Sequence, residues 1–154
     1  MIQRIQSIFI LVAMALVASL IFWPIDMYSS AKGLIELRWD GVWDVTPGCA
    51  EPLVRGLIPV AVIVVAALAL NLAGLFLFKR RKLQMRLVGV AAGVEICLAV
   101  VAVYLGVNIA AGMEMEWHFS ARWLLPTLAA VMDILAYRRI SDDEALVRSL
   151  DRLR

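Results

Sequence analysis

Histidine, cysteine and charged side chains are scarce in this chain. Among its 154 residues are one histidine and two cysteines, and 18% of the residues are charged, where a soluble domain has about 25%. With so few ligand-forming side chains, we expect no metal site, no disulfide framework and no cofactor. The sequence also lacks a nucleophile–base set and a glycine-rich phosphate loop, so we expect a protein that is not an enzyme.

Apolar residues are abundant instead, at 63% of the chain, and they gather in four blocks. A helix needs roughly 20 residues to cross about 30 Å of hydrocarbon. The composition therefore predicts an all-α membrane protein, with a four-transmembrane-helix bundle in residues 1–140. The predicted spans are 5–23, 57–78, 87–107 and 123–137. The first resembles a secretory signal, but its length favours a retained helix, and the fourth is short unless Arg122 and Arg138 reach the interfaces.

Positive charge is unevenly distributed between the ends of these spans. Eleven of the 15 lysines and arginines lie at the amino-terminal end, in the 79–86 connection or after residue 137. Because basic residues near span ends stay cytoplasmic, both termini and the inner loop 79–86 are predicted inside, and the outer loops 24–56 and 108–122 outside. A basic turn between two spans does not indicate nucleic acid, so we expect no nucleic-acid partner. All five tryptophans fall on the outer side, where they would anchor loops at the headgroups or dock a partner.

The larger outer loop contains "LIELRWDGVWDV", which predicts a small outer β-hairpin over 33–46. Asp40-Gly41 favours a tight two-residue turn. That turn would place Arg38 opposite Trp43, where a cation–π contact can form.

The scarce ligand-forming residues are poorly placed for joint chemistry. His118 lies beside Glu114 and Glu116 in the second outer loop, and no further histidine or cysteine accompanies them, so a solvated histidine is expected. Cys49 lies outside and Cys97 lies in the middle of the third span. A disulfide between such different depths is not expected, and Cys97 is interpreted as a small packing residue.

Glu95 interrupts the third span, "GVAAGVEICLAVVAVYLGV". A charged residue at a helix centre costs about 2.5–3.5 kcal/mol, which the apolar residues of the run offset with about 5 kcal/mol. The small residues on its helical face predict that it faces protein. Asn71 on the second span lies at the same depth, about 10–12 Å from the inner end. We therefore predict a hydrogen bond between Asn71 and Glu95 that fixes the register of the two helices.

A functional interpretation of Glu95 remains open beside this structural one. Intramembrane acids can relay protons or bind ions. Asp133 is the other candidate, about one turn from the inner surface, where Arg4, Arg86 or Arg138 could neutralise it. Gly89 and Gly93 form a small-xxx-small pattern on the opposite face of the third span. This pattern favours helix packing or contact with a second chain, so a homo-oligomer is possible.

The tail "SDDEALVRSLDRLR" predicts a short cytoplasmic amphipathic C-terminal helix over 141–154. Ser141 and Glu144 form a capping box at its start. A helix of this length is marginal alone, so it must lie on the membrane, pack under the bundle or dock on a partner. The predicted interaction residues are Asp143, Glu144, Leu146, Val147, Arg148, Leu150, Asp151, Arg152 and Leu153.

The opening "MIQRIQSIFILVA" and the closing "DDEALVRSLDRLR", with four spans between them, resemble a family of small bacterial membrane proteins known only as a domain of unknown function. That family occurs mainly in one group of Gram-negative bacteria. The resemblance implies an inner-membrane protein and lends no activity, catalytic residue or cofactor. We expect a non-enzymatic scaffold or assembly subunit that binds a protein partner at the cytoplasmic face. The alternative is a small transporter or proton-coupled subunit with Glu95 as its working group.

Overall fold

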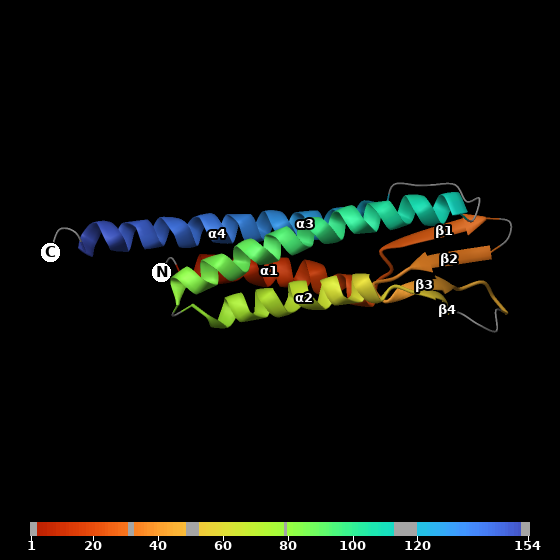
Figure 1. Ribbon diagram of the computed structural model, residues 1–154, viewed down its shortest axis with the longest axis horizontal. Coiled ribbons are helices and arrows are strands. Elements are labelled where there is room, and N and C mark those ends of the chain that lie inside the picture. Colours follow the sequence, from red (N-terminus) through yellow and green to blue (C-terminus); the bar gives the residue numbers. More distant parts are fainter. Residues whose placement is uncertain (1–2, 31–32, 49–52, 79, 113–119, 152–154) are drawn as a thin grey trace.

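The structure, a computed structural model, describes residues 3–30, 33–48, 53–78, 80–112 and 120–151. Within these ranges it has four α-helices, a 3-10 helix and one antiparallel sheet (Figure 1). The helices are α1 Gln3–Phe22, α2 Ile58–Phe76, α3 Arg81–Gly112, η1 Ala121–Trp123 and α4 Leu124–Asp151. The strands are β1 Asp26–Ser30, β2 Gly33–Leu37, β3 Gly41–Asp44 and β4 Leu53–Gly56.

The four α-helices lie side by side, and their packing partners form a closed ring. α1 packs against α2 and α4, and α3 packs against the same two helices. The sheet lies at one end of the molecule, and the first residue of α1 and the α2–α3 connection lie at the other (Figure 1). We call the latter the basic end, because Arg80, Arg81, Lys82 and Arg86 lie there.

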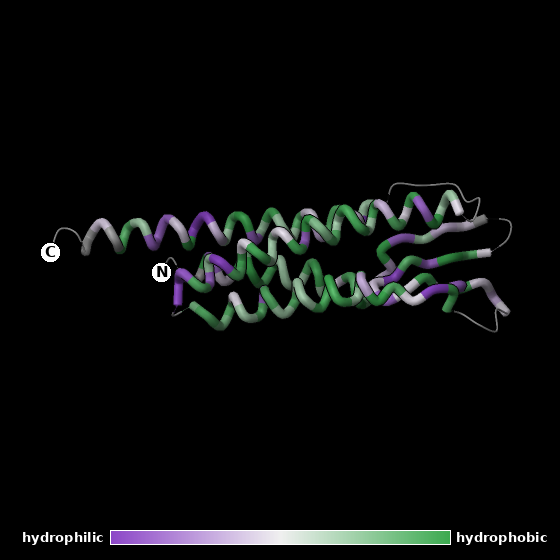
Figure 2. Tube along the Cα trace, in the orientation of Figure 1, coloured by the Kyte–Doolittle hydropathy of each residue, from purple (hydrophilic) through white to green (hydrophobic). Residues whose placement is uncertain are grey.

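Three of the helices are long and apolar enough to cross a membrane. They are Ile5–Phe22, Ile58–Phe76 and Arg81–Gly112, and Figure 2 shows hydrophobic residues along most of their length. α4 is more polar, since Asp133 interrupts its apolar part and Arg138-Arg139 follow directly. Much of its C-terminal part is hydrophilic or neutral in Figure 2.

α4 runs without interruption from Leu124 to Asp151, so the expectation of a separate helix starting at Ser141 is wrong. A capping box satisfies the N–H groups that the first turn of a helix leaves unpaired. Here the preceding turn of α4 already supplies the backbone acceptors. The polar residues after Arg139 therefore extend an existing helix.

The predicted hairpin is present as β2 and β3, in the middle of a four-stranded sheet with the order β1-β2-β3-β4. The predicted turn is displaced by one residue. Arg38 N–H donates to the Gly41 carbonyl at 2.8 Å, so Trp39 and Asp40 form the turn. Glu36, and not Arg38, lies opposite Trp43. The cation–π contact still forms diagonally, with the Arg38 guanidinium 5.6 Å from the Trp43 ring centre.

Gly41 has a different role from the one that the turn motif indicates. A Cβ at this position would lie 2.8 Å from the carbonyl oxygen of Arg55 on β4. The glycine therefore permits the close approach of β4, a strand that the sequence did not predict. β1 was not predicted either, because neither short segment has a clear alternation of apolar and polar residues.

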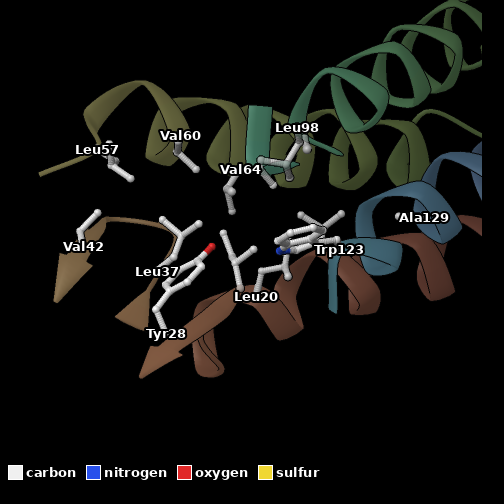
Figure 3. Packing of buried hydrophobic residues seen from close by; sticks show 14 of the residues in the cluster. Leu20, Tyr28, Leu37, Val42, Leu57, Val60, Val64, Leu98, Trp123 and Ala129 are labelled. Carbon is white, nitrogen blue, oxygen red and sulfur yellow. The ribbon is translucent and has the colours of Figure 1, made fainter. Parts of the chain in front are cut away.

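The main apolar core lies where the sheet meets the helices (Figure 3). Tyr28 and Leu37 from the sheet pack with Leu20 and Val64 from the helices. This packing supports strands that would be marginal alone. Trp123 is also buried here, so it belongs to the core and is not free to anchor at a membrane surface.

Candidate functional site

Three polar side chains meet in the interior of the helices, and we call them the buried polar cluster: Asn71 of α2, Glu95 of α3 and Asp133 of α4. Each is 0% exposed. The Asn71 amide Nδ2 donates to Glu95 Oε1 at 2.8 Å, which confirms the predicted hydrogen bond. The cluster therefore connects three helices through polar groups in an apolar interior.

Helical periodicity brings Asn71 and Glu95 together. The buried positions of α2 include Val64, Ala67, Asn71 and Gly74, which share one face. The facing side of α3 is also lined by small residues, as the sequence predicted. A Cβ at Gly74 would lie 3.1 Å from Val88 Cγ2, so the two helices are close at this level.

Asp133 lies deeper than the sequence indicated. Arg86 and Arg138 are exposed, and no described basic residue forms an ion pair with Asp133. The groups that influence it electrostatically are Glu95 and Asn71. The expectation that an arginine neutralises Asp133 near the surface is therefore wrong for the described arginines. Asp133 lies near Glu95 instead.

The cluster is rich in acceptors and poor in donors. Four of its oxygens have no hydrogen-bond partner among the described residues: Asn71 Oδ1, Glu95 Oε2 and both carboxyl oxygens of Asp133. Unpartnered acceptors in an apolar interior are costly, and two carboxylates close together repel each other. Protons on the carboxyl groups would relieve both penalties. The described residues contain no group of three or more metal-ligating side chains.

A second candidate site is the end of α4. The Gln6 amide Nε2 of α1 donates to the Arg139 carbonyl at 3.3 Å and to the Asp143 carboxylate. Asp143, predicted as an interaction residue, is therefore engaged within the chain. Leu146 and Val147 are 58% and 41% exposed. Glu144 has an interaction within the chain. The side chains of Arg148, Leu150 and Asp151, and all of Arg152 and Leu153, lie outside the described part.

Gly89 and Gly93, predicted for helix packing, do not mediate a close approach between described helices. Both are exposed. A Cβ at Gly89 would make an ordinary contact with Tyr137, and one at Gly93 would meet nothing within 4 Å. Cys97 is also exposed, so its predicted packing role is wrong. Cys49, His118 and the neighbouring loop glutamates lie outside the described residues.

The chain is thus a mostly helical protein with a small antiparallel sheet, and three of its helices are long and apolar enough to cross a membrane, as in an α-helical membrane protein. The chain belongs to the family described as Domain of unknown function (DUF4293), whose profile matches residues 2–153. This agrees with the predicted resemblance. No curated protein matches the chain.

Proposed function

We propose that this protein is a non-enzymatic assembly subunit of the bacterial inner membrane, which holds a protein partner at the cytoplasmic end of α4. In this arrangement all four helices span the bilayer and both termini are cytoplasmic. One observation supports the orientation. The basic residues of the α2–α3 connection lie at the same end as the first residue of α1, and this is the distribution that the positive-inside rule favours.

α4 serves as the fourth span although it is less apolar than the others. It packs against both α1 and α3, and its acid Asp133 is fully buried. At the sheet end, Arg122 Nη1 donates to the Pro24 carbonyl at 2.9 Å, so the guanidinium has a polar partner. Long basic side chains at both ends can bridge a short apolar segment to the interfaces.

The observation that carries this proposal is the extension of α4 beyond the other three helices (Figure 1). In that region Gln6 of α1 binds α4 at Arg139 and Asp143. Leu146 and Val147 lie past this point and are exposed. Adjacent exposed apolar residues on a helix outside the bundle suit docking in a groove of a partner.

Site-specific photocrosslinking in living cells tests this proposal. A photoreactive residue at Leu146 is expected to give one protein adduct of defined mass. The same residue at Leu128, which is exposed on the apolar part of α4, serves as the control and should give none. Replacing Val147 with Asp should abolish the Leu146 adduct without lowering the amount of protein. Identical adduct patterns at both positions would contradict the proposal.

A small proton-coupled subunit is the second candidate, and the position of Asp133 favours it. A relay needs more than one titratable group along its path. The sequence already paired Glu95 with Asn71 but put Asp133 near the inner surface, whereas in the folded chain Asp133 also lies close to Glu95.

The two candidates predict opposite results from two kinds of variant. Glu95→Gln and Asp133→Asn retain side-chain size and remove only the acidic proton. If the protein is proton-coupled, these variants lose proton flux in proteoliposomes, while Val147→Asp keeps it. If it is an assembly subunit, Val147→Asp loses the cellular phenotype and the two acid variants keep it.

A further inference from the structure

A pocket of about 440 Å³ opens at the basic end, between the start of α1 and the α2–α3 connection. Its walls come from α1, the α2–α3 connection and the start of α3. The lining residues are Gln6, Ser7, Ile8, Leu11, Phe78, Arg81 and Gln84. It lies where two apolar spans end, which is the level of the lipid headgroups for helices that cross a bilayer.

The walls of the pocket are of two kinds. Ile8, Leu11 and Phe78 are exposed apolar side chains on the outside of the helices. Arg81 and Gln84 form a polar part on the first turn of α3. A ligand with a charged group attached to an apolar chain fits this combination better than a free ion does, because a free ion would leave the apolar wall unused.

Gln84 is the most informative residue of the pocket. It is 2% exposed, and its side chain makes no hydrogen bond with any described residue. The other buried glutamine, Gln6, differs because its amide already donates to α4. The Gln84 amide atoms are not among the fully buried unpaired polar atoms, so the small exposed part of this side chain includes the amide, which lines the pocket and can bind a ligand or water there.

Positive charge around the pocket is not balanced within the described chain. Arg80, Arg81, Lys82 and Arg86 form no ion pair with a described residue. The first turn of α3 contains no acidic residue, although the start of a helix carries partial positive charge and favours an anion. An anion from outside the described residues can therefore bind at this end of α3.

We propose that this pocket binds the headgroup of an anionic phospholipid. The Arg81 guanidinium binds the phosphate, the Gln84 amide binds a glycerol or ester oxygen, and the apolar wall contacts the first carbons of an acyl chain. The site requires only that α1 and α2 cross the lipid. It is independent of which side is cytoplasmic and of the partner proposed for α4, so it can fail without affecting the proposed function.

Native mass spectrometry of the purified protein, with added phosphatidylglycerol or phosphatidylcholine, tests the site. The native chain is expected to retain phosphatidylglycerol preferentially. Arg81→Gln should weaken that binding about tenfold, the effect of losing one charge-assisted hydrogen bond. Lys82→Gln is the matched control, because it removes the same charge from an exposed neighbour outside the pocket and should leave binding unchanged.

Gln84→Leu distinguishes binding in the pocket from non-specific attraction to surface charge. It alters no charge, so it should weaken lipid binding only if the lipid occupies the pocket. Circular dichroism of each variant identifies any that fails to fold, and Arg81, which is partly exposed, gives a variant outside the buried core. Equal losses in Arg81→Gln and Lys82→Gln would overturn the proposal, as would equal retention of the two lipids. If glycerol phosphate competes as effectively as phosphatidylglycerol, the pocket binds a soluble anion, and this result would also overturn the proposal.

Discussion

The amide of Asn71 donates a 2.8 Å hydrogen bond to the carboxyl group of Glu95, and this bond joins α2 to α3 in the apolar interior. The two residues are 24 positions apart in the sequence. Neither has access to water, so each depends on the other, and on Asp133, for polar contacts.

The first prediction concerns the energy of this bond. Asn71→Leu should destabilise the protein, because it removes the donor and leaves a further Glu95 oxygen unpaired. The double variant Asn71→Leu/Glu95→Leu should recover much of the loss. A double-mutant cycle measured by unfolding in detergent micelles should give a coupling of about 0.6–1.7 kcal/mol. Additive effects would mean that the two side chains do not interact.

The second prediction compares two glycines of α3. A Cβ at Gly106 would lie 2.8 Å from the Tyr28 hydroxyl oxygen and 2.9 Å from Trp123 Cζ2. Gly106→Ala should therefore lower the free energy of unfolding by about 1–3 kcal/mol through overpacking. Gly93→Ala is the matched control, since its Cβ meets nothing within 4 Å, and it should be neutral or stabilising. Thermal unfolding of the two variants side by side would measure the difference.

The third prediction concerns alkaline pH. Burial, together with the neighbouring Asp26, raises the pKa of Tyr28 well above its ordinary value of 10.0. The unfolded chain releases the phenol proton near pH 10 and the folded chain retains it. Stability from this group is therefore complete below about pH 10 and falls by about 1.4 kcal/mol for each pH unit above it. Tyr28→Phe should remove this dependence in denaturant titrations at a series of pH values, and parallel curves for the two proteins would contradict the assignment.

The fourth prediction concerns the attachment of α4 to α1. Gln6→Leu removes the side-chain donor to Arg139 and Asp143. Amide hydrogen exchange should then increase in α4 from about Ile140 onward, while exchange around Asp133 stays slow. Ser19→Ala, which removes a local hydrogen bond elsewhere in α1, serves as the control. Unchanged exchange after Arg139 would show that the Gln6 contact does not hold the helix.

The features that the sequence predicted depend on short-range patterns. Helical spacing and depth were sufficient to pair Asn71 with Glu95, because both lie on small-residue faces of adjacent spans. Turn chemistry was sufficient to locate the β2–β3 hairpin. Its turn is displaced by one residue, which shifts the pairing by two, so that Glu36 and not Arg38 lies opposite Trp43. Gly41 is required by the approach of Arg55 on β4, a contact between segments whose pairing the local pattern does not reveal.

The features that the sequence did not predict depend on the arrangement of several helices. Counting residues from the end of a span placed Asp133 near the surface, because that count took α4 to end at Tyr137. The helix continues to Asp151, and its packing against α1 and α3 places Asp133 beside Glu95. Local capping signals at Ser141 were likewise overridden, because the preceding helix already satisfied the backbone.

The continuity of α4 has a mechanical consequence. Asp133 and Leu146 are 13 residues apart on one unbroken helix, a distance of about 20 Å along its axis. With no hinge between them, a twist of α4 that gives the Asp133 carboxyl group new neighbours must turn Leu146 through the same angle. In such a rigid helix, a change in the neighbours of the buried acid would be coupled to a change in the direction that Leu146 faces.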